Sequence, residues 1–260
     1  MYEPRTYRNF YNTERFTPFT VQFRDTDLWI GVDRQSFVPE MALFARNETV
    51  KLRHELENYL LTDPWFGRTL EPVEPKPGAP RSAWLLADAG ARSATGPMAA
   101  VAGLFAWHVG EKIRQNFSVK ELVIENGGDM YLLLQNDLAV TVFAGSSPLS
   151  EKMAVVVPAG TTPCGVCTSS GTVGHSFSFG KADAVMVACQ SPLMADALAT
   201  ALANRVKSPA DVQDVLTFSE EYPEIESLVV ICRDKLGIRG SFAVKFVQAA
   251  AKTKSSEEDD

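Results

Sequence analysis

The residues with the clearest potential for chemistry lie between Val166 and His175, in a run rich in Ser, Thr and Gly (VCTSSGTVGH). Small residues leave backbone N–H groups approachable, as loops that bind anions require. The imidazole of His175 suits acid–base work near neutral pH, although a histidine satisfied within its own loop is the alternative. We interpret the run as a phosphate-binding loop with His175 as the candidate catalytic residue. Its candidate ligand contacts are Ser169, Ser170, Gly171 and Thr172.

A second group of candidate residues lies in the segment 192–205, which reads as a helix. It places Asp196 and Thr200 four residues apart, on one helix face. A carboxylate and a hydroxyl are oxygen ligands of the kind that Mg²⁺ takes, with waters and ligand phosphates completing its shell. Spacing alone leaves another interpretation open, a helix face with a capping or surface carboxylate. The two segments together favour a site for a phosphate-bearing ligand and a hard metal ion.

A glycine pair and a cysteine pair add further candidates. Asn126, Gly127, Gly128 and Asp129 read as a turn between two strands, either a plain tight turn or one whose polar side chains face the ligand. Cys164 and Cys167 match C-x-x-C, but no helix follows as in a redox motif, and no second pair completes a zinc site. We therefore expect small residues packed at a strand end. Cys167 as a thiolate nucleophile beside His175 is the alternative.

Composition limits the function classes. The 260 residues are 45% hydrophobic and 22% charged, which is typical of a globular protein. A net charge of −7 argues against nucleic acid as a partner. No apolar run approaches the roughly 20 residues of a membrane span, and no signal-peptide pattern opens the chain. We therefore expect a cytoplasmic protein without a membrane partner. The two other histidines, His54 and His108, are expected to be structural.

Periodicity and turn signals predict an α+β fold with largely antiparallel sheets, because short turns join most of the strands. Strand–helix–strand blocks in both halves favour one domain over residues 1–250, followed by a disordered acidic tail at 251–260. Helices are expected at 39–61, from 96 onward, at 192–205 and around 210–218. Strands are expected at 19–23, 28–32, 83–87, 122–124, 130–134, 139–143, 153–157, 184–188, 228–232 and 241–247.

Five short motifs together resemble the ApbE superfamily, whose best-known members are magnesium-dependent flavin transferases. They are GPMAAVAG at 96–103, ENGGD at 125–129, CTSSGTVGHS at 167–176, GKADA at 180–184 and ADALAT at 195–200. The resemblance is to a short, soluble branch of that superfamily. It implies a duplicated T-fold-like architecture, in which two similar halves carry antiparallel sheets with helices packed over them. It also implies that Asp196 and Thr200 bind Mg²⁺ beside the pyrophosphate of FAD or a related flavin nucleotide, with a backbone carbonyl near 94–96 as a third ligand.

The chain departs from the transferases after His175. Those enzymes continue with an Asp-Pro-x-Thr-Gly segment, whereas this chain continues with SFSFG. We therefore expect a phosphorylated aromatic small molecule as ligand, with Mg²⁺, and phosphoryl or pyrophosphate transfer or hydrolysis as the reaction. Efficient FMN transfer to a protein threonine is not expected. A non-catalytic ligand carrier or sensor on the same fold is the main alternative, and a thiol-dependent enzyme using Cys167 is the third.

Overall fold

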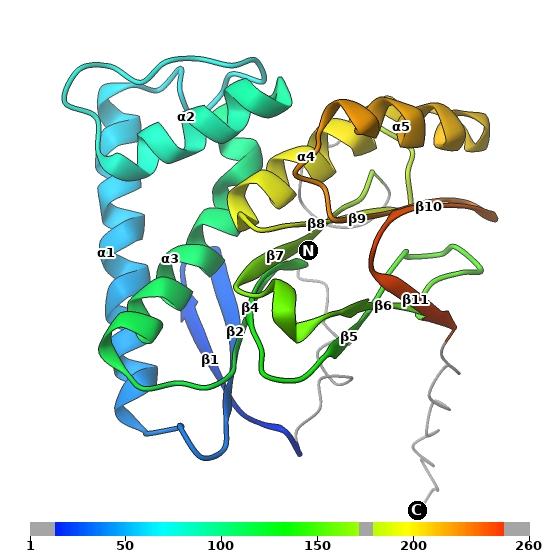
Figure 1. Ribbon diagram of the computed structural model, residues 1–260. Coiled ribbons are helices and arrows are strands. Elements are labelled where there is room, and N and C mark those ends of the chain that lie inside the picture. The colour runs from blue at the N-terminus through cyan, green and yellow to red at the C-terminus, as the bar shows by residue number, and fades with distance from the viewer. Residues whose placement is uncertain (1–13, 172–178, 247–260) are drawn as a thin grey trace, which may run out of the picture.

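A large antiparallel sheet forms the centre of the molecule (Figure 1). The structure is a computed structural model, and it describes residues 14–171 and 179–246. The eight strands of this sheet follow the order β1-β2-β3-β4-β7-β8-β9-β10, and each pairs antiparallel with its neighbours. Their bounds are β1 (Phe16–Phe23), β2 (Thr26–Asp33), β3 (Leu122–Asn126), β4 (Asp129–Leu133), β7 (Cys164–Ser169), β8 (Ala184–Cys189), β9 (Ser227–Cys232) and β10 (Lys235–Gly240).

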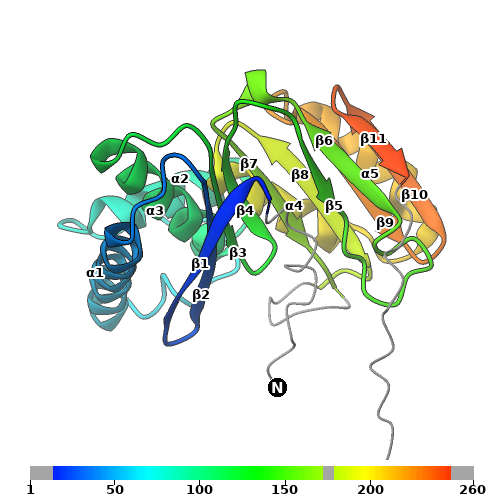
Figure 2. The same ribbon diagram turned by 90° about the horizontal axis from the view of Figure 1, so that it is seen from below.

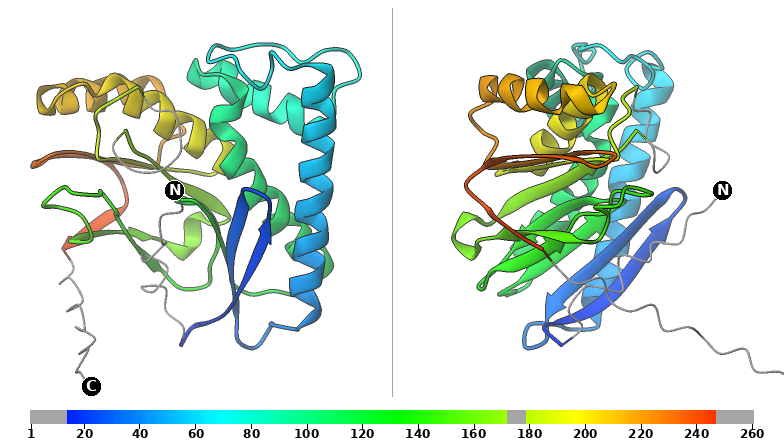
Figure 3. Two further views of the ribbon diagram at one scale, coloured as in Figure 1. Left: turned by 180° about the vertical axis from the view of Figure 1, so that it is seen from behind. Right: turned by 90° about the vertical axis from the view of Figure 1, so that its right-hand side faces the viewer.

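Helices cover one face of this sheet, and a small sheet of order β11-β6-β5 covers the other (Figures 2 and 3). The small sheet consists of β5 (Leu138–Thr141), β6 (Met153–Val157) and β11 (Ala243–Phe246). The helices are α1 (Glu40–Thr62), α2 (Arg81–Ser93), α3 (Val101–Asn116), α4 (Pro192–Arg205) and α5 (Val212–Phe218), with 3-10 turns η2 (Pro97–Ala100), η3 (Ala159–Thr161), η4 (Pro209–Asp211) and η5 (Ser219–Glu221). No helix in the described part of the chain is long and apolar enough to cross a membrane.

Strand β8 is apolar throughout because it lies between two cores. Every residue of β8 is buried. Successive side chains of a strand point to opposite faces, so Val185 and Val187 pack under the helices. Ala184 and Met186 pack against the small sheet instead. The sheet therefore separates a helix-side core from a sheet-side core.

Close packing of α4 on the sheet depends on glycine. Helix α4 begins with Ser191, whose hydroxyl accepts a hydrogen bond from Met194 N, and with Pro192 at its first position. A Cβ on Gly165 of β7 would lie 2.3 Å from Pro192 Cα. A Cβ on Gly103 of α3 would lie 2.5 Å from the Pro192 carbonyl oxygen. The first turn of α4 thus fits between two residues that lack a side chain, Gly165 on β7 and Gly103 on α3.

The predicted α+β class with largely antiparallel sheets is confirmed. The predicted helix at 192–205 and strand at 153–157 match α4 and β6. The strand predicted at 83–87 is wrong, since these residues lie in α2. The buried residues Ala83, Leu86, Ala87 and Gly90 recur at helical spacing, which a five-residue window hides.

The loop predicted from Val166 onward is also partly wrong. Residues 164–169 form β7, between β4 and β8. Its Thr and Ser residues are typical of turns, but pairing with the neighbouring strands β4 and β8 outweighs that weak local preference. Strand β10 was missed as well, because an edge strand with two glycines and exposed polar residues lacks an apolar pattern.

We expect Gly165→Ala to destabilise the protein by about 2 kcal/mol or more, because the new methyl group would overlap Pro192 and α4 would have to shift. Chemical denaturation followed by circular dichroism measures the change. Gly160→Ala is the matched control, since a Cβ there would meet nothing within 4 Å. Equal midpoints for the two variants would show that α4 does not depend on the approach at Gly165.

Candidate functional site

Three of the segments selected from the sequence meet on the helix-covered side of the sheet. Asp196 and Thr200 lie on α4, and Asn126 to Asp129 form the turn between β3 and β4. Ser169 ends β7, and Asp129 pairs with Cys167 of the same strand. Thr172 and His175 lie outside the described residues, so the roles proposed for them stay predictions.

Asp196 joins α4 to the first turn of α3. Its Oδ2 accepts a hydrogen bond of 2.8 Å from Gly103 N, and the backbone N–H of Ala102 is also within hydrogen-bond reach. Amides in the first turn of a helix lack intrahelical partners, and the helix dipole favours a carboxylate there. Asp196 is only 7% exposed. Asp196 therefore caps the first turn of α3 and is not a surface carboxylate.

The β3–β4 turn reaches the same helix end. Asn126 Nδ2 donates a hydrogen bond of 3.1 Å to Ala102 O. Gly127 and Gly128 have φ of +70° and +103°, which side-chain-bearing residues rarely adopt, so the two glycines make a tight turn possible here. Glu125 is fully buried and accepts a hydrogen bond of 2.7 Å from Gly128 N. The turn is held rigidly, with Asn126 beside α3 and Asp129 at the start of β4.

Asp129 and Asp196 form a pair of buried carboxylates. Burial raises the pKa of Asp129 well above its usual value, and the negative charge of Asp196 raises it further. Burial likewise raises the pKa of Asp196, while the amides of Gly103 and Ala102 oppose that shift. Asp129 Oδ1 is buried without a hydrogen-bond partner in the described part of the chain. A pair of this kind is characteristic of a site that binds a cation or moves a proton.

The strand beneath the pair contributes a thiol and a hydroxyl. Burial raises the pKa of the Cys167 thiol well above its usual value, and Asp129 and Asp196 add to this shift. Cys167 Sγ lies 3.4 Å from Pro192 O. The thiol is thus kept protonated, which disfavours the thiolate nucleophile. Ser169 Oγ is buried and has no hydrogen-bond partner among residues 14–171 and 179–246.

The remaining candidates lie at the margin of this group. Thr200 is half-buried, one turn beyond Asp196 on the same helix face. Ser170 is half-buried and Gly171 is exposed. Gly171 N donates a hydrogen bond of 2.9 Å to Ala182 O, and a Cβ on Gly171 would lie 2.2 Å from the Gly180 carbonyl oxygen. The glycine is required here for close approach of two backbone segments.

The donor set fits a hard cation better than a soft one. Carboxylate and hydroxyl oxygens are what Mg²⁺ prefers, and the protonated Cys167 is a poor ligand for a soft metal. Within the described ranges no three His, Cys, Asp or Glu side chains converge in a geometry that would hold a metal. Any ion at Asp196 would therefore need ligand or water oxygens as well. The unpartnered Asp129 Oδ1 beside a second buried carboxylate is consistent with such an ion.

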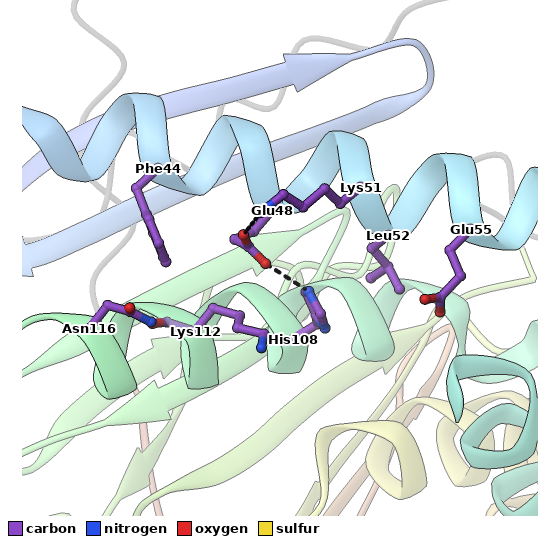
Figure 4. A pocket seen from close by; sticks show the side chains of 8 residues that line it. All are labelled: Phe44, Glu48, Lys51, Leu52, Glu55, His108, Lys112 and Asn116. Atoms are coloured by element: carbon purple, nitrogen blue, oxygen red, sulfur yellow. Dashed lines mark hydrogen bonds and ion pairs between the residues drawn. The ribbon is translucent and has the colours of Figure 1, made fainter. Parts of the chain in front are cut away.

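A polar groove, which the sequence analysis missed, lies between α1 and α3 (Figure 4). Its volume is about 510 Å³. His108 Nε2 lies 3.6 Å from Glu48 Oε2 across the groove, and Glu48 Oε1 accepts a hydrogen bond of 2.6 Å from Lys51. Burial lowers the pKa of His108, and Glu48 partly offsets that shift. None of the candidate site residues lines this groove, whose lining is Phe44, Glu48, Lys51, Leu52, Glu55, His108, Lys112 and Asn116.

The comparisons place the chain in a family. Residues 8–218 match the family model described as AbpE bacteria, and the chain belongs to that family. It is 35% identical over 222 residues to the UPF0280 protein MJ1526 of Methanocaldococcus jannaschii, covering 84% of this chain and 88% of the relative. It is 43% identical over 187 residues to a UPF0280 protein of Methanosphaerula palustris, covering 72% of this chain and 76% of the relative.

Two solved structures with a similar fold are flavin transferases by name. The flavin transferase ApbE of Vibrio cholerae superposes with a TM-score of 0.57 at 12% identity, over 86% of this chain and 96% of that chain. The apo form of the Pseudomonas stutzeri flavinyl transferase ApbE gives 0.59 at 14% identity, over 86% and 94%. The resemblance to the ApbE superfamily is confirmed, and at these identities the structural likeness establishes the fold.

The shifted pKa of His108 predicts a pH dependence of stability. Its pKa is lower in the folded protein than the usual value of about 6.5, so the unfolded chain binds more protons below that pH. The free energy of unfolding should therefore fall as the pH drops from 7 to 5, by at most about 1.4 kcal/mol per pH unit for one proton. His108→Gln should flatten this slope in urea titrations.

Glu48→Gln provides the matched test. It removes the charge that holds up the pKa of His108, so the slope should steepen or extend to lower pH. Parallel curves for wild type and His108→Gln would show that His108 does not carry this part of the pH dependence.

Proposed function

We propose that this protein binds a phosphorylated aromatic ligand, a flavin nucleotide such as FAD or a related compound, together with Mg²⁺ at the Asp196 site. The observation that carries the proposal is the buried carboxylate pair Asp129 and Asp196 at the first turn of α3. Two carboxylates buried side by side lower the stability of the fold. Their presence together therefore suggests that they serve a function. Family membership and the fold shared with flavin transferases support the choice of ligand.

The chain's own residues divide the binding task. Asp196 and Thr200 would hold the metal, which when bound neutralises phosphate charge and stabilises charge that develops during phosphoryl transfer. Ser169 and Ser170 would donate hydrogen bonds to phosphate oxygens from the end of β7. Gly171 would leave room for the ligand beside them, since its own N–H is already bonded to Ala182 O. Asn126 would fix the ligand beside the Gly127–Gly128 turn, whose backbone leaves room for close approach. His175 would move a proton in any phosphoryl or pyrophosphate transfer or hydrolysis.

A second candidate function, a non-catalytic carrier or sensor, uses the same pocket. The sequence after His175 favours it, because SFSFG replaces the segment that the transferases carry there. Incubation with FAD and Mg²⁺, followed by chromatography for FMN and AMP, separates the two functions. Release of both products supports the enzyme, whereas retention of intact FAD supports the carrier.

Asp196→Asn should weaken Mg²⁺-dependent FAD binding by at least about tenfold, because the amide cannot supply an anionic metal ligand. The amide oxygen can still accept the hydrogen bond from Gly103 N, so the fold should persist. Isothermal titration calorimetry with and without Mg²⁺ measures the affinity, and circular dichroism checks the fold. Unchanged Mg²⁺-dependent affinity in a folded variant would remove Asp196 from the metal site.

Transfer of FMN to a threonine-containing acceptor peptide should be absent or very slow. Phosphate affinity comes from the loop and the metal, but transfer also requires an acceptor held in line with the reacting phosphorus. Mass spectrometry of the peptide after incubation with FAD and Mg²⁺ detects the adduct. Efficient flavinylation would show that the Asp-Pro-x-Thr-Gly segment is dispensable. His175→Ala should then reduce any hydrolysis more than binding.

A further inference from the structure

Asp129 occupies a position that directs its carboxylate toward α4. It begins β4 and stands opposite Cys167 of β7, and side chains at paired positions share one face of a sheet. The Cys167 side chain belongs to the helix-side core with Leu193 and Ala197 of α4. Asp129 therefore projects from the same face, beneath the helix that carries Asp196. The two side chains are 8% and 7% exposed.

No Lys, Arg or His of the described residues is among the main influences on the pKa of either carboxylate. Asp196 is held by the amides of α3. The Asp129 carboxylate is within hydrogen-bond reach of the Cys167 thiol and the Thr168 backbone N–H, but its Oδ1 is buried without a partner in the described part of the chain. A buried, unpartnered carboxylate oxygen beside a second carboxylate needs a proton or a cation. Glu125, the third nearby carboxylate, is engaged in the turn through Gly128 N.

We infer that Asp129 is a second carboxylate ligand of the metal ion, beside Asp196. This inference rests on the proposed metal site and extends it. With one carboxylate, Mg²⁺ depends on ligand phosphates for most of its charge compensation. Two carboxylates supply a charge of −2 from the protein itself. The site then binds a divalent cation before any nucleotide arrives, and the nucleotide binds to a metal that is already in place.

The test is binding of Mn²⁺, a paramagnetic substitute for Mg²⁺, in the absence of nucleotide. Electron paramagnetic resonance counts free Mn²⁺ during titration of the full chain. Wild type should bind one Mn²⁺, and Asp129→Asn should weaken that binding by at least about tenfold. Addition of MnCl₂ should raise the melting temperature of wild type, because an ion that binds only the folded state stabilises it. The same addition should leave the melting temperature of Asp129→Asn nearly unchanged.

Asp33→Asn is a matched control. Asp33 is also 8% exposed, but it lies at the end of β2 remote from the β3–β4 turn and accepts hydrogen bonds from the backbone of Ser36, Lys120 and Glu121. This variant should bind Mn²⁺ as wild type does. Melting in EDTA confirms that each variant is folded.

The outcomes separate this inference from the proposed function. If wild type binds Mn²⁺ only when FAD is present, or if Asp129→Asn binds Mn²⁺ alone as tightly as wild type, Asp129 is not a metal ligand and the Asp196 site still stands. If Asp196→Asn retains full Mn²⁺ and FAD binding, the proposed site itself is wrong, and this inference is lost with it.

Discussion

The hydrogen bond from Gly103 N to Asp196 is the contact on which the arrangement of the site depends. It connects the first turn of α3 to the second turn of α4. Helix α3 in turn holds Asn126 through Ala102 O, so the β3–β4 turn is fixed relative to both helices. Helix α4 lies directly on β7 because Gly165 has no side chain. Displacement of Asp196 would therefore move three of the segments that carry candidate ligand contacts.

The same contact holds the carboxylate of Asp196 in the protein interior beside that of Asp129, where burial of charge is unfavourable. Capping the first turn of α3 could be achieved by a neutral Ser or Asn, without a buried charge beside Asp129. The capping role explains the carboxylate of Asp196. The Asp129 carboxylate, in contrast, has an oxygen, Oδ1, that receives no hydrogen bond from any described residue. Local arrangements that oppose stability concentrate at functional sites. The pair is thus stronger evidence for function than either residue alone.

Sequence reasoning was most accurate where a pattern is long and amphipathic or wholly apolar. The bounds of α4 and β6 follow from the sequence, and so does the pairing of Asp196 with Thr200 on one helix face. The sequence of β7 resembles a loop because Thr168 and Ser169 are typical turn residues, although they pair with Met186 and Val185 of β8. The placement of Asp129 beside Asp196 was not predictable, since it depends on non-local strand pairing and on the approach of α4. Thr172 and His175 lie outside the described residues, so their predicted roles remain predictions.

The glycines of the motifs are explained by geometry as much as by chemistry. Gly103, in the motif at 96–103, leaves space for Pro192 O and Asp196 Cβ, which a Cβ there would meet at 2.5 and 3.0 Å. The same absence of a side chain exposes the amide that Asp196 accepts from. A motif on α3 and a motif on α4 therefore form one packing unit. The transferase structures with this fold share only 11–14% identity with the chain. A fold can host many functions, so the side chains of this unit bear more directly on function than the fold does.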